Sequence, residues 1–419
     1  MRLIINGGKK LNGRIAVNGS KNCCLPLISA ALLTGQHVTI TNVPGIDDVK
    51  SITELINSLG VLCHFSNNTF EIYPGQITQN KLDRTMSRKM RASILLTAPV
   101  LARTGEVFFP HPGGCVIGER PIDIFLDGYQ KFGAAAYKEG DDYAIRAKKL
   151  KAGEYFFNNV SVTATESLIM LATLAQGRTT LINAACEPEV VEMANFLNQC
   201  GAKITGAGTP FVTIDGISSY DTMKTVIYRN IPDRIEAGSF ILMAVATGSE
   251  ITVANCVPEH LQSLLTVLDR MQVGYEKQAG AVKILNGSVP SAVSVKTHEY
   301  PGFPTDLQSP LIVALTQAKG LSIVQETVFE GRMFWTEDLK RMGAEIMVLD
   351  TFRVSVQGPS KLRGHELESP DIRAGMAYVI AGLAAKGTTT VHGINLIDRG
   401  YERIENRLSE IGADVVRIN

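Results

Sequence analysis

Polar side chains recur at equivalent places along this chain of 419 residues. Six glycines each precede a β-branched run, and the residue 14 positions before each glycine is polar. In chain order these residues are Lys21, Arg91, Thr163, Arg234, Asp306 and Arg373. All stand at or just before the start of an apolar helical stretch, where the partial positive charge of a helix N-terminus disfavours cations. Four cations at such places favour a site for an anion, bound by helix N-termini and basic side chains together.

Further arginines follow the β-branched runs. Arg332 and Arg399 each stand 12 residues after their glycine, and Arg120 stands 15 residues after its own. We expect these loops to gather on one face of each domain, so that two domains facing each other there would form a cationic cleft. The alternative, for any one of these cations taken singly, is an ordinary solvated surface residue.

A cysteine lies in an unusual loop. Cys115 belongs to the stretch FFPHPGGCVIGERPID, whose prolines and glycines disfavour a helix or a central strand. Unpaired cysteines are usually buried, so a cysteine in such a loop indicates reactivity, and Arg120 nearby would favour its thiolate. We expect the other cysteines to lie mostly in the core, with Cys23 and Cys24 the ambiguous pair because they follow Lys21 so closely.

The elements that position these residues form six repeats. The marker glycines are separated by 70, 72, 71, 72 and 67 residues and are Gly35, Gly105, Gly177, Gly248, Gly320 and Gly387. Each unit reads as an apolar helix ending at a left-handed glycine, a β-branched strand, an amphipathic helix such as residues 47–60, and further strands. A second marker, an apolar residue followed by glycine, closes the amphipathic helix in five copies and becomes Met271-Gln272 in the fourth.

The repeats predict an α/β protein of two domains with three units each. The alternatives are a β/α barrel, which would usually show eight simpler units, and one continuous solenoid.

Composition excludes several other classes of function. Basic and acidic residues number 41 each, so a chain-wide nucleic-acid surface is not expected. The sequence has no apolar run of 18 residues and no secretory signal, which predicts neither a membrane helix nor export. Seven cysteines, an odd number without metal-ligand spacing, predict free thiols in a reducing compartment, the cytoplasm. The sequence lacks the common P-loop, dinucleotide, zinc-protease and serine-hydrolase motifs.

Several longer stretches carry a family resemblance. NGSKNCCLPL, HPGGCVIGERPID, IPDRIEAGSF and DRGYERIE, with others between them, span the whole chain. In these stretches the sequence resembles the UDP-N-acetylglucosamine 1-carboxyvinyltransferases, the enolpyruvyl transferases of peptidoglycan synthesis. The resemblance implies two inside-out α/β domains, each of three βαβαββ units. One would cover residues 21–229, and the other residues 1–20 together with 230–419.

The resemblance also implies a reaction. The enolpyruvyl group of phosphoenolpyruvate would pass to the 3′-hydroxyl of UDP-N-acetylglucosamine by addition and elimination, with release of phosphate, as the first committed step of cell-wall peptidoglycan synthesis. The partners would be these two small molecules, with no nucleic acid and no membrane, and no metal or organic cofactor is implied. The oligomeric state stays open.

Residue roles follow from the same resemblance. Lys21, Arg120 and Arg399 would bind the phosphate, and Arg332 with Arg373 the carboxylate. Asp306 would be the base for the sugar hydroxyl. Cys115 would protonate the methylene carbon and would be alkylated by the epoxide fosfomycin. Further substrate-binding positions implied in this way are Asn22, Arg91, Pro121, Ile122, Asp123, Ile124, Asn159, Val160, Ser161, Val162 and Val328.

Departures from the family pattern leave two alternatives. Phe125 stands where the family commonly has histidine, and DLQSP replaces the usual DMQAQ. One alternative is the shikimate-pathway enzyme 3-phosphoshikimate 1-carboxyvinyltransferase, which lacks the counterpart of Cys115. The other is a non-catalytic nucleotide-sugar-binding paralogue, which the presence of Cys115 and Asp306 argues against.

Overall fold

The computed structural model describes residues 1–113, 121–285, 287 and 289–418, which form two compact units. One unit, here the Lys21 unit, comprises residues 19–113 and 121–231. The other, here the Asp306 unit, comprises residues 1–18 and 232–418. The units are divided after residues 18 and 231, whereas the family resemblance implies divisions after residues 20 and 229. Each unit has its own apolar core.

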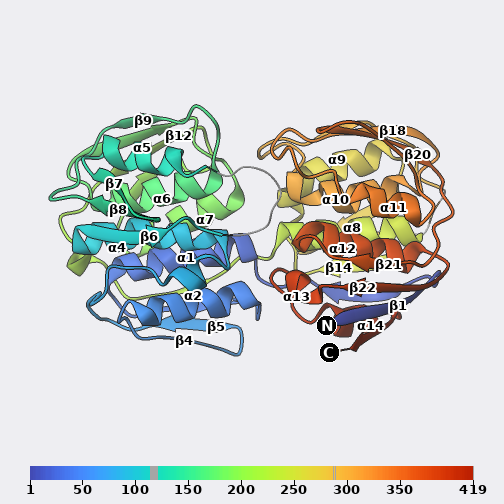
Figure 1. Ribbon diagram of the computed structural model, residues 1–419, viewed down its shortest axis with the longest axis horizontal. Helices are drawn as coiled ribbons and strands as arrows, with labels where there is room; N and C mark the ends of the chain where they lie inside the picture. The colour runs from blue at the N-terminus through green and yellow to red at the C-terminus, as the bar shows by residue number, and fades with distance from the viewer. Residues whose placement is uncertain (114–120, 286, 288, 419) are drawn as a thin grey trace. The chain divides into compact units, whose positions relative to one another are not determined.

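Small sheets, three in each unit, repeat one arrangement (Figure 1). In the four-stranded sheets, an edge strand runs parallel to the strand at the repeat glycine, and two antiparallel strands continue the sheet. The second repeat has a three-stranded sheet, with an isolated parallel bridge from Lys81 to Phe108 in place of the edge strand. This shared arrangement confirms the six predicted repeats.

The strands of the Lys21 unit are β13-β3-β5-β4 (Val226–Arg229, Val38–Thr41, Thr69–Ile72, Cys63–Ser66), β6-β8-β7 (Glu106–Pro110, Asp142–Arg146, Ala135–Glu139) and β9-β10-β12-β11 (Glu154–Phe156, Arg178–Ile182, Phe211–Asp215, Lys203–Thr205). Those of the Asp306 unit are β2-β14-β16-β15 (Asn12–Ala16, Glu250–Ala254, Ala281–Ile284, Tyr275–Gln278), β17-β18-β20-β19 (Val295–Lys296, Gly320–Gln325, Arg353–Gly358, Glu345–Asp350) and β21-β22-β1-β23 (Glu366–Glu368, Gly387–His392, Arg2–Gly7, Asp414–Ile418).

Three helices fill the centre of each unit. They touch one another, and most of their residues are buried whichever way they face. In α10, for example, all eight residues are buried. The central helices are α1 (Lys21–Thr34), η1 with α4 (Arg91–Leu96, Thr97–Thr104) and α6 (Val162–Thr173) in one unit, and α8 (Arg234–Thr247), η4 with α10 (Thr305–Leu307, Gln308–Leu315) and α12 (Ile372–Ala384) in the other.

The remaining helices are short or amphipathic. They are α2 (Asp47–Ser58), α3 (Arg84–Ser87), α5 (Asp123–Lys131), α7 (Pro188–Gln199), η2 (Tyr220–Thr222), η3 (Pro258–Leu261), α9 (Gln262–Arg270), α11 (Thr336–Arg341), α13 (Ile394–Ile397) and α14 (Ile404–Glu410). Figure 1 shows α8, α10 and α12 enclosed by strands of their own unit, the inside-out arrangement in which helices form the core. None of the helices in the described ranges is long and apolar enough to cross a membrane.

The repeat glycines do not all close a helix. Every one has positive φ, and Gly35, Gly105 and Gly248 directly follow α1, α4 and α8. In the other three copies the prediction is wrong, because α6, α10 and α12 end earlier and the glycine stands at the start of the next strand. There the residue before the glycine forms a parallel bridge with a neighbouring segment, so the chain must leave the helix sooner.

The second marker of the fourth repeat, Met271-Gln272, keeps the left-handed turn although it has no glycine. Gln272 has φ of 58°, although a side chain makes this conformation unfavourable. The break in the sequence pattern therefore leaves the local backbone unchanged.

Left-handed asparagines join neighbouring strands in three repeats. Asn42, Asn183 and Asn255 follow β3, β10 and β14 and have positive φ. The side-chain amide of each donates to a carbonyl just beyond the parallel edge strand, at 2.6–2.8 Å. Each asparagine thus links the end of its own strand to the end of the parallel edge strand.

Candidate active site

Helix N-termini hold the six equivalent residues. Helices begin at Lys21, Arg91 and Arg234, whereas Thr163 and Arg373 are second residues of their helices. Asp306 lies in the turn η4 that leads into α10. The predicted placement of all six at helix starts is confirmed.

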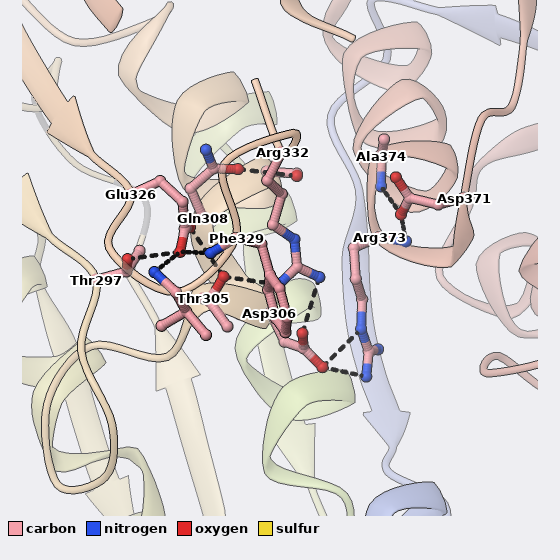
Figure 2. Close-up of polar contacts among 12 residues, drawn as sticks. Thr297, Thr305, Asp306, Gln308, Glu326, Phe329, Arg332, Asp371, Arg373 and Ala374 are labelled. Atoms are coloured by element: carbon pink, nitrogen blue, oxygen red, sulfur yellow. Dashed lines mark hydrogen bonds and ion pairs between the residues drawn. The ribbon is translucent and has the colours of Figure 1, made fainter. Parts of the chain in front are cut away.

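In the Asp306 unit, one carboxylate joins two buried arginines (Figure 2). Asp306 Oδ1 accepts a hydrogen bond from Arg332 Nη2 at 2.8 Å, and Oδ2 accepts from Arg373 Nη2 at 2.8 Å and Nε at 3.0 Å. The arginines are only 4% and 5% exposed, whereas the side chain of Asp306 is 24% exposed. Two guanidiniums therefore converge on a carboxylate that solvent still reaches.

The charges of this cluster reinforce one another. Burial raises the pKa of Asp306, but the guanidiniums of Arg373 and Arg332 outweigh burial and hold it well below its usual range. Burial likewise lowers the pKa of Arg373, and Asp306 more than compensates by raising it. The cluster is fully ionised at neutral pH, so Asp306 is a weak base while both pairs persist.

The first turn of α12 fixes Arg373. Asp371 caps the helix by accepting hydrogen bonds from the backbone N–H of Arg373 at 2.7 Å and of Ala374 at 3.0 Å. The Arg373 guanidinium also donates to the hydroxyl of Tyr401 at 3.3 Å. The Asp371 cap explains why a cation is tolerated at this helix N-terminus.

In the Lys21 unit, Lys21 has an acidic partner. Its Nζ lies 2.8 Å from Asp48 Oδ2, and both side chains are at least nine-tenths buried. Ser20 caps α1, and Asn22 is the second residue of that helix. A cation at this helix start is therefore balanced by Asp48 from the first turn of α2.

The other positions in this unit that the sequence predicts to bind substrate fall into two groups. Arg91 Nη2 donates to the carbonyl of Pro121 at 3.1 Å, which joins the start of η1 to residues 121–124 at the start of α5. The hydroxyl of Tyr155, in β9, donates to the carbonyl of Ile124 at 3.2 Å. Residues 159–162 follow β9, and Ser161 caps α6.

Two further predicted site residues belong to the Asp306 unit but lie outside the cluster of Asp306, Arg332 and Arg373. Arg399 is half-buried in the turn after α13. Val328 is 37% exposed in the loop after β18 that leads to Arg332. Cys115 and Arg120 lie outside the described residues.

The six described cysteines form no disulfide with one another. Cys23 and Cys24, the ambiguous pair, are buried in α1. Burial, and then the nearby charge of Glu189, raise the pKa of Cys23 well above its usual value. Burial likewise raises the pKa of Cys63, Cys186, Cys200 and Cys256. These environments are those of unreactive thiols.

The sequence did not point to the acidic and hydroxyl residues that pair with the cations or with their hydrogen-bond partners. These residues are Asp48, Glu326 and Thr305. Of the three, Glu326 lies between a β-branched strand and Val328, a predicted substrate-binding residue. Within residues 1–113, 121–285, 287 and 289–418, no group of three or more histidine, cysteine or acidic side chains could hold a metal ion.

Comparison with known proteins finds full-length relatives. The family model described as EPSP synthase (3-phosphoshikimate 1-carboxyvinyltransferase) matches residues 5–408. The UDP-N-acetylglucosamine 1-carboxyvinyltransferases of Desulfosudis oleivorans and Halothermothrix orenii are each 41% identical over 417 residues, covering 100% of this chain and 99% of theirs.

Solved structures share the fold. The enolpyruvyl transferase NikO from Streptomyces tendae superposes with a TM-score of 0.89 at 23% identity, over 99% of this chain and 98% of NikO. An EPSP synthase from Acinetobacter baumannii superposes with a TM-score of 0.73 at 17% identity, over 100% of both chains. The predicted α/β fold class is confirmed.

Proposed function

The chain belongs to the UDP-N-acetylglucosamine 1-carboxyvinyltransferase family of enolpyruvyl transferases, and we propose that it transfers the enolpyruvyl group of phosphoenolpyruvate to the 3′-hydroxyl of UDP-N-acetylglucosamine. Phosphate is released, and the product enters peptidoglycan synthesis. The proposal rests on 41% identity along the whole chain to relatives bearing that name. The family model alone also covers the shikimate-pathway enzyme, so the full-length relatives decide the acceptor.

The Asp306 cluster suits the carboxylate of phosphoenolpyruvate. A guanidinium presents parallel N–H groups that match a carboxylate, and two of them already converge on one. We assign Arg332 and Arg373 to the substrate carboxylate, and Lys21, Arg120 and Arg399 to its phosphate. Asn22, Arg91, residues 121–124, residues 159–162 and Val328 would line the rest of the substrate site.

Binding of the substrate would activate the base. In this structure Asp306 occupies the guanidiniums that we assign to the substrate carboxylate. A substrate carboxylate that competes for them would loosen the ion pairs and raise the pKa of Asp306 toward that of an ordinary carboxyl group. Asp306 could then accept the proton of the 3′-hydroxyl while the oxygen of that hydroxyl adds to C2 of phosphoenolpyruvate.

The addition also needs a proton at C3, which we assign to Cys115. The tetrahedral adduct then loses a proton from C3 and releases phosphate, which restores the double bond. Cations on the departing phosphate stabilise its charge in this step.

The remaining assignments follow from this reaction. The substrates are small molecules, and six described cysteines that form no disulfide with one another support the predicted cytoplasmic location. A non-catalytic paralogue would have no need of the ionised cluster at Asp306, which argues for an enzyme.

Phosphate release decides the assignment. We expect purified protein to release phosphate from phosphoenolpyruvate with UDP-N-acetylglucosamine and not with shikimate 3-phosphate. Asp306→Asn is the background control. Release with shikimate 3-phosphate alone would overturn the assignment, and release with neither acceptor would favour the paralogue.

A further inference from the structure

A buried carboxylate organises the loop between β18 and Arg332. Glu326 is 1% exposed and directly follows β18. Its Oε1 accepts hydrogen bonds from the backbone N–H of Thr327 at 3.1 Å, Val328 at 2.8 Å and Phe329 at 3.3 Å. Three consecutive N–H groups aimed at one oxygen fold the loop around the carboxylate.

The same carboxylate binds two threonine hydroxyls. Thr297 Oγ1 donates to Oε1 at 3.0 Å, and Thr305 Oγ1 donates to Oε2 at 2.8 Å. Thr297 lies just after β17 and Thr305 begins η4. Figure 2 shows both hydroxyls pointing to Glu326 from different elements. They differ in what else they touch, because only Thr305 contacts an arginine.

Thr305 connects Glu326 to Arg332. Thr305 Oγ1 accepts a hydrogen bond from Arg332 Nη1 at 2.7 Å. A hydroxyl has a single proton, so donation to Glu326 turns its lone pairs toward the guanidinium. The Glu326 carboxylate therefore orients the Thr305 hydroxyl, and this hydroxyl in turn fixes the position of the Nη1 end of the Arg332 guanidinium.

Arg332 has few other supports. Its Nε is buried without a hydrogen-bond partner among the described residues. In the part of the chain that the structure describes, the other hydrogen-bond partner of the guanidinium is Asp306, and the ring of Phe329 lies 5.4 Å from the guanidinium carbon. If a substrate carboxylate competes with Asp306, Thr305 becomes the partner that keeps the guanidinium in place.

We propose that Glu326 is a positioning residue, which acts through the Thr305 hydroxyl to orient Arg332 toward the carboxylate of phosphoenolpyruvate. This inference rests on the proposed function, because it takes that carboxylate as the ligand of Arg332. The Thr297 hydroxyl supports the same carboxylate and plays no part in the orientation of Arg332.

Matched threonine variants test the proposal. Thr305→Val and Thr297→Val each remove one hydroxyl from Glu326, but only the first removes a contact to Arg332. We expect Thr305→Val to raise the KM for phosphoenolpyruvate about tenfold or more, with the KM for UDP-N-acetylglucosamine within about twofold of wild type. Thr297→Val should leave both KM values within about twofold, and Thr305→Ser, which keeps the hydroxyl, should restore the wild-type values.

Glu326→Gln provides an independent variant. In this variant an NH2 group replaces one of the two carboxylate oxygens. The side chain could then no longer accept hydrogen bonds both from the loop N–H groups and from the Thr305 hydroxyl. We expect a higher KM for phosphoenolpyruvate in this variant too, with a cooperative unfolding transition. If Thr305→Val does not fold, Glu326→Gln and Thr305→Ser carry the comparison.

Two results would overturn the proposal. One is an equal rise in KM for Thr305→Val and Thr297→Val, and the other is a Thr305→Ser variant as impaired as Thr305→Val. Calorimetric titration of the same variants with phosphoenolpyruvate separates this inference from the proposed function. If wild-type protein shows no transfer, the proposed function fails, while weaker binding by Thr305→Val alone would still support the role of Glu326.

Discussion

Replacing Asp306 with asparagine should weaken catalysis and strengthen substrate binding. Asp306 accepts three charge-assisted hydrogen bonds, at 2.8, 2.8 and 3.0 Å, from the arginines assigned to the substrate carboxylate. Each such bond is worth about 1.5–3 kcal/mol. Regaining one of them would tighten phosphoenolpyruvate binding about 10- to 100-fold. Loss of the base should lower kcat by about 10²–10⁴-fold.

The same substitution should change the stability and its dependence on pH. Removing one partner of a buried ion pair costs about 3–5 kcal/mol, and the partial exposure of Asp306 favours the lower end. Because folding lowers the pKa of Asp306, its stabilisation is complete above about pH 4 and is lost as the pH falls below that value. Asp306→Asn should therefore be less stable than wild type at pH 7, and the difference should shrink below about pH 4.

Three measurements check this reasoning, with one matched control. Calorimetry gives the affinity for phosphoenolpyruvate, phosphate release gives kcat, and urea unfolding at several pH values gives the stability. Asp338→Asn is the control, because the Asp338 side chain is 25% exposed and pairs with Arg341 outside the cluster. It should not tighten binding. Unchanged or weaker binding by Asp306→Asn would refute the idea that Asp306 competes with the substrate.

The remaining expectations concern the other cations, the thiols and one backbone turn. Arg399→Ala should lower kcat/KM about 10- to 100-fold, and Lys21→Ala should lower both kcat/KM and the melting temperature, because it breaks a buried ion pair; normal activity in both variants would refute their assignment to phosphate. One equivalent of fosfomycin should label Cys115 and none of the six described cysteines, as peptide mapping can decide, since burial raises the pKa of five of those thiols. Gln272→Gly should raise the free energy of unfolding by about 0.5–1 kcal/mol by relieving a left-handed backbone, while Gln278→Gly in strand β15 should lower it; a loss of stability in both would contradict this view of the turn.

Much of the fold could be predicted from the period of the sequence repeats. The six residues 14 positions before these glycines all lie at the start of a central helix, although the central helices differ in length. The same period did not predict that Gly177 directly precedes a strand and that Gly320 and Gly387 begin one, since this depends on bridges to segments elsewhere in the chain.

The candidate site was predictable as a set of charges, and its internal pairing was not. The sequence indicated that Asp306, Arg332 and Arg373 serve one site, but their ion pairs join residues 26 and 67 positions apart. Glu326 was missed because an acidic residue after a strand is ordinarily a solvated loop residue. The left-handed asparagines Asn42, Asn183 and Asn255 could have been recognised in the sequence as turn residues, since each is followed by proline within five residues.

The order of synthesis matters for a unit that contains both early and late parts of the chain. Strand β2 pairs with β14, and β1 lies between β22 and β23, where Asn6 contacts Asp414, 408 residues further on. At a translation rate of about 5–20 residues per second, β1 waits about 20–80 s for that last partner. The Lys21 unit needs nothing beyond residue 231, so it can fold while the chain is still on the ribosome. Residues 1–18 meanwhile lack their strand partners, and unpaired strand edges are a template for aggregation during translation.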